Sequence, residues 1–180
     1  MMVIAAVRNE QELEAALASR AKMIFWLNPN ILTLDQTVRE VHAAGKKIFL
    51  HIDLAEGVGK DKAGLIYVKN AGMDGVISTR VNLIKFAKEV GLFTVQRFFI
   101  VDSHSVDTTV ESLKSSKADM IEIMPGIVTK VIADLKTRLN IPIIAGGLIE
   151  TGKEIEEAAH SGASAVSTSK QELWGTKEKV

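Results

Sequence analysis

The sequence predicts an α/β fold, and within that class a compact (β/α)8 TIM-type barrel with short loops. Apolar or β-branched runs recur eight times, amphipathic segments lie between them, and the units repeat every twenty-odd residues without a break. Strands that alternate with helices in this way pair in parallel through right-handed crossovers. Eight near-equal units favour closure into a barrel, and an open doubly wound sheet is the alternative.

Eight short runs have the composition of strands that are buried on both faces. Each is rich in apolar or β-branched residues and is bounded by polar residues, glycine or proline, as buried parallel strands are. The expected strands cover residues 2–7, 23–27, 47–52, 74–78, 93–99, 119–124, 141–145 and 163–168.

Helices are expected between the strands, where apolar residues recur at intervals of three and four. The clearest segments are residues 10–20, 34–45, 81–91 and 151–162. Glycine readily adopts the left-handed conformation that follows a last helical turn, and such segments end at Gly45, Gly72, Gly91 and Gly162. Asp102 and Ser103 have the residue types of an N-cap for a helix that begins near Ser105.

The length and composition of the chain fit one globular domain over residues 1–180, with 47% hydrophobic residues and no linker or low-complexity tract. Barrels of this kind usually have roughly 200 to 400 residues, so we expect short loops or one reduced helix. The chain has no cysteine, and its four histidines have no metal-ligand spacing, so neither disulfides nor a metal site are expected.

No apolar run approaches the length of a membrane span, and no leader-like segment begins the chain, so a cytoplasmic protein without a membrane partner is expected. The 22 basic and 22 acidic residues cancel, which argues against a uniformly basic nucleic-acid surface. A local basic patch stays open, because many cations fall near predicted helix ends or strand starts. They are Arg20, Lys22, Lys46, Lys47, Lys88, Lys114, Lys117, Lys136 and Arg138.

The loops after the seventh and eighth expected strands have the residues of a phosphate site. Gly146 and Gly147 follow the seventh strand, and the run Ser167, Thr168 and Ser169 ends the eighth. Barrels of this type often bind phosphate there, through glycine N–H groups, hydroxyls and a helix N-terminus. The alternative is a purely structural role, in which the two glycines allow a turn with positive φ and the three hydroxyls cap a helix.

Charged residues also stand at other strand ends, where ligands bind in such barrels. His51 and Asp53 are two residues apart and share a strand face that we expect to point into the barrel mouth. Arg97 and Glu122 lie on adjacent expected strands and are candidates for a ligand site or for an internal ion pair. Arg80 ends the fourth strand, where it could reach an anion or stand in solvent at a helix start.

Segments along the whole chain resemble the glycerol uptake operon antiterminator regulatory protein family. They are AAVRNEQELE, KKIFLHIDL, DGVISTR, TVQRFFIVDSHSV, ADMIEIMPGIVTKVI, IPIIAGGLIET and GASAVSTSKQELW, in order from about residue 5 to residue 174. The resemblance implies a barrel-like cytoplasmic regulator that responds to glycerol 3-phosphate. Such a regulator acts on the leader messenger RNA of glycerol-utilisation genes and prevents premature termination.

Carried onto this sequence, the resemblance places the effector at the top face. It implies Gly146, Gly147, Ser167, Thr168 and Ser169 around the phosphate, Arg97 and Arg80 as supporting cations, and Asp53 and Glu122 toward the glycerol hydroxyls. No catalytic residue, metal or further cofactor is implied. The expected partners are glycerol 3-phosphate and a leader messenger RNA, with homo-oligomers left open.

Two other functions stay open at the level of the sequence. The first is an enzyme that acts on a small sugar or triose phosphate, because many barrel enzymes use the same phosphate loops and Asp53, Glu122 or His51 could be a general base. The second is a binding module that acts only through protein partners.

Overall fold

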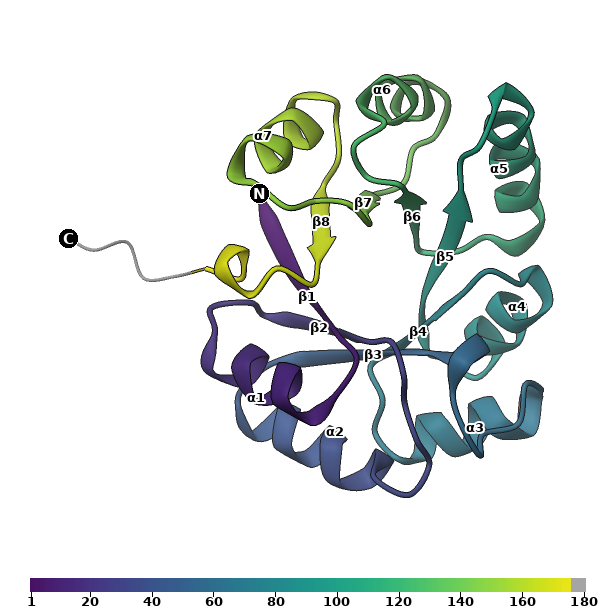
Figure 1. The fold of residues 1–180 in the computed structure, drawn as a ribbon. Coiled ribbons are helices and arrows are strands. Elements are labelled where there is room, and N and C mark those ends of the chain that lie inside the picture. Colours follow the sequence, from purple (N-terminus) through teal and green to yellow (C-terminus); the bar gives the residue numbers. More distant parts are fainter. Residues whose placement is uncertain (176–180) are drawn as a thin grey trace.

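The computed structural model describes residues 1–175, which form a closed barrel of eight parallel strands surrounded by helices (Figure 1). Each strand pairs with its neighbours in the sequence, and β1 pairs with both β2 and β8, which closes the sheet. The strands are β1 (Met2–Val7), β2 (Met23–Trp26), β3 (Lys47–His51), β4 (Gly75–Ser78), β5 (Phe93–Phe99), β6 (Met120–Met124), β7 (Ile143–Gly146) and β8 (Ala165–Thr168).

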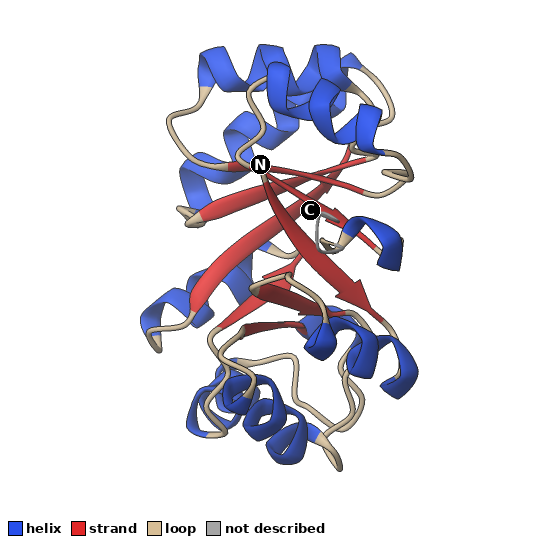
Figure 2. Ribbon diagram, turned by 90° about the vertical axis from the view of Figure 1, so that its left-hand side faces the viewer, coloured by secondary structure: helices blue, strands red, loops and turns tan. Residues whose placement is uncertain are grey.

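Seven α-helices alternate with these strands among residues 1–175 and lie outside the barrel wall (Figure 2). They are α1 (Glu10–Ala18), α2 (Leu34–Ala43), α3 (Lys62–Asn70), α4 (Val81–Glu89), α5 (Ser103–Ser116), α6 (Thr129–Arg138) and α7 (Gly152–His160). Two short 3-10 helices, η1 (Ile52–Leu54) and η2 (Gln171–Leu173), follow β3 and β8. The closed barrel is therefore confirmed, and within the described residues the reduced unit is the last one, where η2 follows β8.

Most expected elements lie where the pattern predicts, and several strand ends differ by one or two residues. The strand expected over residues 47–52 ends at His51, because the backbone turns into η1 at Ile52. The strand expected over residues 141–145 begins two residues later and extends to Gly146. Asp102 is the N-cap of α5, which begins at Ser103, and Ser105 completes a capping box. None of the helices in the described residues is long and apolar enough to cross a membrane.

Alternate residues of each strand fill the barrel or face the helices. The inner layer is apolar below the mouth, with Phe25, Phe49, Ile77, Val95 and Ile144 buried in one cluster. The rings of Phe25 and Phe49 lie 5.8 Å apart, which fills the cross-section with aromatic area. The lower barrel is thus a packed core, and only its mouth has room for polar groups.

Gly75, the first residue of β4, shows how closely this core is packed. A Cβ atom at this position would lie 2.5 Å from Phe49 Cε1 and 2.6 Å from the Phe93 carbonyl oxygen. The glycine therefore makes room for the Phe49 ring inside the barrel.

We predict that Gly75→Ala lowers the free energy of unfolding by about 2 kcal/mol, because overpacking a filled core forces side chains and backbone apart. Gly152→Ala is the matched control, since a Cβ there meets nothing within 4 Å in the first turn of α7. That control should be neutral or more stable by about 0.5 kcal/mol. Urea unfolding of both variants measures this, and a Gly75→Ala protein as stable as the parent would contradict the packing argument.

Candidate functional site

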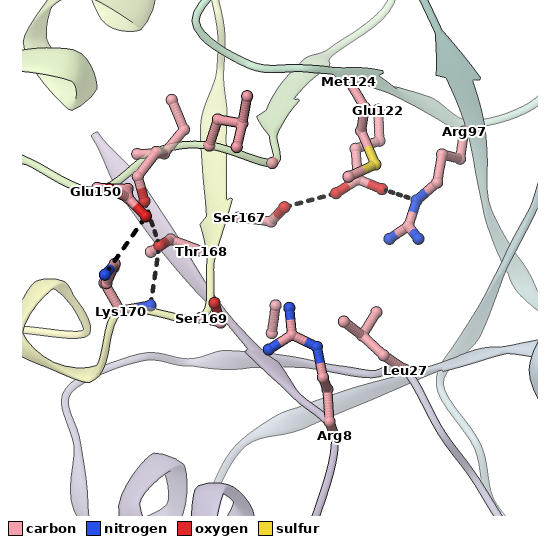
Figure 3. Close-up of a pocket in the computed structure, with 14 residues that line it drawn as sticks. Arg8, Leu27, Arg97, Glu122, Met124, Glu150, Ser167, Thr168, Ser169 and Lys170 are labelled. Atoms are coloured by element: carbon pink, nitrogen blue, oxygen red, sulfur yellow. Dashed lines mark hydrogen bonds and ion pairs between the residues drawn. The ribbon is translucent and has the colours of Figure 1, made fainter.

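A cavity of about 240 Å³ opens at the mouth of the barrel, where the strands end (Figure 3). Barrels of this type bind their ligands at this end. Residues from β1, β5, β6 and β8 and from the loops after β1, β2, β7 and β8 line it. They are Ala6, Arg8, Leu27, Arg97, Glu122, Met124, Gly147, Leu148, Ile149, Glu150, Ser167, Thr168, Ser169 and Lys170.

A buried ion pair forms one wall of the cavity. Arg97 of β5 and Glu122 of β6 are register partners, and Arg97 Nε donates to Glu122 Oε2 over 2.6 Å. The Ser167 hydroxyl donates to Glu122 Oε1 over 2.5 Å. Glu122 has no exposed surface, and an unpaired carboxylate there would cost several kcal/mol. Arg97 and Ser167 therefore make this buried charge tolerable.

The outer nitrogens of Arg97 remain available to a ligand. Only its Nε atom donates to a protein acceptor in the described part of the chain. The guanidinium end lies on the cavity side of Glu122 (Figure 3). Glu122 thus orients a cationic group with free N–H donors toward the cavity.

Gly146, the last residue of β7, and Gly147, which follows it, are glycines for different structural reasons. A Cβ at Gly146 would overlap Glu122 Oε1 and Ser167 Oγ, so the glycine makes room for the buried carboxylate. Gly147 has φ +75°, in the left-handed region, and a Cβ there would lie 2.7 Å from Met124 Cε. Both residues therefore have an internal reason to be glycine besides any approach of a ligand.

The loop after β7 presents main-chain donors at the cavity. Within residues 1–175 the N–H groups of Gly147, Leu148 and Ile149 donate to no protein acceptor, and neither does that of Ser169. Leu148 also has a left-handed backbone, with φ 58°. Free N–H groups gathered on adjacent loops form a partial positive charge that suits an oxyanion.

Thr168 ties these two loops together. Its hydroxyl donates to the Ile149 carbonyl oxygen over 2.6 Å and accepts from the Lys170 N–H over 3.0 Å. Trp174, which is buried, donates through Nε1 to the Thr168 carbonyl oxygen over 2.7 Å. The Thr168 hydroxyl is thus used inside the protein, whereas Ser169 lines the cavity with no side-chain hydrogen bond among the described residues.

Two further cations border the cavity. Arg8 follows β1 and points toward the cavity opposite Arg97 (Figure 3). Its side chain is 51% exposed, and its one ion-pair contact within residues 1–175 is that of 3.9 Å to Glu12. Lys170 follows β8 and lies 3.4 Å from Glu150. The lining thus holds three cations, Arg8, Arg97 and Lys170, and two carboxylates, Glu122 and Glu150, which leaves it an excess of positive charge.

Asp53 and Arg80 form a separate pair next to the mouth. The Asp53 carboxylate accepts from the Ser78 hydroxyl over 3.0 Å, the Thr79 N–H over 2.8 Å and Arg80 Nε over 2.9 Å. Burial raises the pKa of Asp53, but these hydrogen bonds, led by that of Arg80, outweigh burial and hold the pKa below its ordinary value. Asp53 is therefore a fixed carboxylate.

His51 is buried at the end of β3, on the same strand face as Phe49. Neither ring nitrogen has a hydrogen-bond partner within the described residues. Burial, followed by the charge of Arg97, lowers the pKa of His51 to about 4; Asp53 opposes this and Lys60 adds to it. The imidazole is therefore neutral at pH 7.

The cavity brings together six of the nine residues nominated from the sequence: Arg97, Glu122, Gly147, Ser167, Thr168 and Ser169. Gly146 lies beneath the carboxylate, while Asp53 and Arg80 pair outside the cavity wall. Contact of any of the nine with a ligand stays a prediction.

The sequence analysis missed Arg8 and Lys170. Arg8 directly follows the first strand, so the rule for charged strand ends could have found it. Lys170 comes next after the serine and threonine run at the end of β8. The described residues contain no cluster of three or more histidine, aspartate or glutamate side chains that could hold a metal ion.

Comparison with known proteins adds an independent finding. The family model described as glycerol-3-phosphate responsive antiterminator matches residues 3–174. The Escherichia coli K12 protein YgcP is 35% identical over 179 residues, covering 99% of this chain and 94% of that protein.

Two solved structures are also similar over nearly their whole length. The glycerol uptake operon antiterminator regulatory protein of Listeria monocytogenes is 34% identical, with a TM-score of 0.91 over 97% of this chain and 95% of that one. A glycerol uptake operon antiterminator-related protein of Thermotoga maritima is 31% identical, with a TM-score of 0.86 over 96% and 97% of the two chains.

We predict that the His51 ring stays neutral down to about pH 4, whereas it takes up a proton near pH 6.5 when the chain is unfolded. Between these values the unfolded state binds the proton more readily. The free energy of unfolding should therefore fall as the pH drops from 6.5 to 4, by up to roughly 3 kcal/mol from this residue, and be unaffected by it above pH 6.5.

An NMR titration of the ring together with urea unfolding at pH 7 and pH 5 measures this effect. His51→Gln is the control, because it removes the titrating group and should flatten the difference. A ring that titrates near pH 6.5 in the folded protein would contradict the prediction.

We predict that Arg8→Gln weakens the binding of inorganic phosphate about tenfold, because a charge-assisted hydrogen bond to the anion is lost. The free energy of unfolding should change by less than about 0.5 kcal/mol, since Arg8 is exposed and its contact to Glu12 is long. Phosphate titration followed by NMR measures the affinity. Arg39→Gln, on the exposed face of α2, is the control; equal affinities in the two variants would remove Arg8 from the site.

Proposed function

The chain belongs to the glycerol-3-phosphate responsive antiterminator family, and from this premise we propose that it binds glycerol 3-phosphate in the barrel-mouth cavity. We propose further that the bound effector changes its affinity for the leader messenger RNA of glycerol-utilisation genes. In this role the protein works in the cytoplasm, needs no cofactor besides the effector and acts as a regulator.

The observation that carries this proposal is the cationic, donor-rich cavity at the loops after β7 and β8. It offers free main-chain N–H groups at Gly147 to Ile149 and at Ser169, together with the outer nitrogens of Arg97. A phosphate monoester carries the charge and the acceptor oxygens that such an arrangement recognises. The volume of about 240 Å³ suits a small effector.

Glu122 takes a supporting part in this proposal. Both of its oxygens already accept hydrogen bonds, from Arg97 and from Ser167. Its role is therefore to hold Arg97 toward the phosphate, and its lone pairs are less available to glycerol hydroxyls than the resemblance implies.

The enzyme alternative has less support from the geometry. A general base needs a carboxylate or imidazole that can reach a substrate proton. Glu122 is neutralised by Arg97 and fully buried, and Asp53 is held by Arg80 and two further donors. The hydrogen bonds to Asp53 hold its pKa below the ordinary value, whereas a base working near pH 7 requires a raised one.

The RNA would bind outside the cavity, through a basic surface that follows its phosphates. Part of the basic set nominated from the sequence is already engaged. Lys47, Lys88 and Arg138 each pair with an aspartate, and Lys46 donates to two main-chain carbonyl groups. The proposal therefore rests on family membership for its RNA partner and on the cavity for its effector.

We predict that glycerol 3-phosphate and the leader RNA change each other's affinity by the same factor, about 5 to 150-fold, because binding free energies at coupled sites are reciprocal. Calorimetric titration of glycerol 3-phosphate with and without the leader transcript, and of the transcript with and without the effector, measures both factors.

A scrambled RNA of equal length is the control and should leave the affinity for the effector unchanged. Equal effector affinities with and without the leader RNA would contradict the predicted coupling. If the protein binds neither glycerol 3-phosphate nor the transcript, the whole proposed function is wrong.

A further inference from the structure

A second recess, of about 290 Å³, lies beside the barrel-mouth cavity, where β1 and β2 end. The loops after these strands start side by side, because the Leu27 N–H donates to the Val7 carbonyl oxygen over 2.8 Å. The residues that line this β1–β2 recess are Arg8, Asn9, Glu10, Trp26, Asn28, Asn30, Leu32 and Thr33. Of these, Arg8 also lines the barrel-mouth cavity, so the two hollows are neighbours.

Trp26 brings an unpaired donor to the β1–β2 recess. Its side chain is only 6% exposed, and its indole N–H donates to no acceptor within residues 1–175. In that part of the chain the fully buried side-chain nitrogen and oxygen atoms without a partner are those of His51, so Trp26 Nε1 keeps access to solvent. A nearly buried indole N–H usually has a hydrogen-bond partner, and this one has none unless a ligand supplies it.

Two amide side chains add further hydrogen-bonding groups. Asn28 is exposed and makes no side-chain hydrogen bond among the described residues. Asn9 caps α1, with its Oδ1 accepting from the Glu12 N–H over 2.9 Å, and its amide nitrogen donates to no protein acceptor there. An amide donates and accepts at once. The recess therefore presents several donors and an acceptor to one bound group.

The charges of the recess indicate that this group is neutral. Arg8 and Glu10 are the charged residues of its lining, one of each sign, so the recess lacks the excess of positive charge that suits the barrel-mouth cavity to an anion. The guanidinium of Arg8 also offers a flat face on which a planar ring can stack. A planar, uncharged ring with donors and acceptors on its edge matches these features, and nucleobases have this chemistry.

The loop after β2 is held in place without a ligand. Asn30 Nδ2 donates to Glu56 Oε2 over 2.8 Å, and the Glu56 N–H donates to the Pro29 carbonyl oxygen over 2.9 Å. The Ile31 N–H returns a hydrogen bond to the Glu56 carbonyl oxygen over 3.0 Å. The wall that carries Asn28 is thus preorganised, which lowers the cost of ordering it on binding.

We propose that the β1–β2 recess binds one unpaired nucleobase of the leader RNA. The base stacks on Arg8 and accepts a hydrogen bond from Trp26, and Asn28 and Asn9 bind its edge. Proteins that read single-stranded RNA bind unstacked bases in this way. This inference rests on the proposed function, which names a leader RNA but no residue that reads its bases.

The two tryptophans of the chain allow a direct test by NMR. Trp174 is buried and its indole N–H donates to the Thr168 carbonyl oxygen, so its signal is an internal control. The protein is titrated with the leader RNA and, separately, with adenosine, guanosine, cytidine and uridine. The indole N–H signal of Trp26 should shift with the leader RNA and with at least one nucleoside, and that of Trp174 should stay in place.

A variant then measures the contribution of the recess to RNA affinity. Asn28→Ala should weaken the leader RNA about tenfold in calorimetric titrations, because hydrogen bonds to a base edge are lost. The affinity for glycerol 3-phosphate should be unchanged, since Asn28 does not line the barrel-mouth cavity. Asn82→Ala, at an exposed position on α4, is the matched control and should leave both affinities as they are. Thermal unfolding shows that each variant is folded.

The outcomes separate this inference from the proposed function. If neither the leader RNA nor any nucleoside moves the Trp26 signal, or if Asn28→Ala binds the RNA as tightly as the parent, the recess is no base site and the proposed function stands. If only a free nucleoside moves the signal, its assignment to RNA is wrong. A signal that moves with protein concentration alone would make the recess an interface between copies of the chain. If the parent binds no leader RNA, the RNA part of the proposed function itself fails.

Discussion

The buried carboxylate of Glu122 is the group on which the rest of the barrel mouth depends. A charge with no exposed surface persists only with close partners, and Arg97 and Ser167 supply them from the strands β5 and β8. The same carboxylate excludes a Cβ at Gly146, so β7 also adapts to it. Four consecutive strands are thereby fixed around one charge, and Arg97 is left with its outer nitrogens toward the cavity.

This arrangement divides the mouth into two chemically different halves. On the side of the loops after β7 and β8, free N–H groups, Arg8 and Lys170 create a region suited to negative charge. On the side of β3 and β4, Asp53 is neutralised by Arg80 and His51 is held neutral. Arg97 lies between the two halves, and of the two only the half at the loops after β7 and β8 lines the cavity.

The sequence was sufficient for the barrel and for the Arg97–Glu122 pair, because strand alternation and parallel neighbours follow from local pattern. The sequence was insufficient to place the Asp53 side chain, which we expected on the same strand face as His51. The two-residue period of the strand stops where η1 begins at Ile52, and the Asp53 carboxylate then accepts a hydrogen bond from Ser78 of β4. The sequence also did not reveal why residue 146 is a glycine, because the atoms that a Cβ there would overlap belong to Glu122 and Ser167, which are far away in sequence. The two glycines indicated a loop with free N–H groups, but nothing in the sequence indicated those of Leu148 and Ile149.

The two halves also differ in how completely the protein satisfies its own polar groups. Thr168 joins the loops after β7 and β8, and Trp174 holds Thr168 in turn, so the loops that carry the free N–H groups are fixed before any ligand arrives. Preorganised donors need no ordering on binding, and this half therefore suits affinity for the anion. On the side of β3, in contrast, both ring nitrogens of His51 lack a hydrogen-bond partner among the described residues. Because each unsatisfied buried group costs about 1 to 3 kcal/mol, this half of the mouth lowers the stability of the fold instead of adding to it.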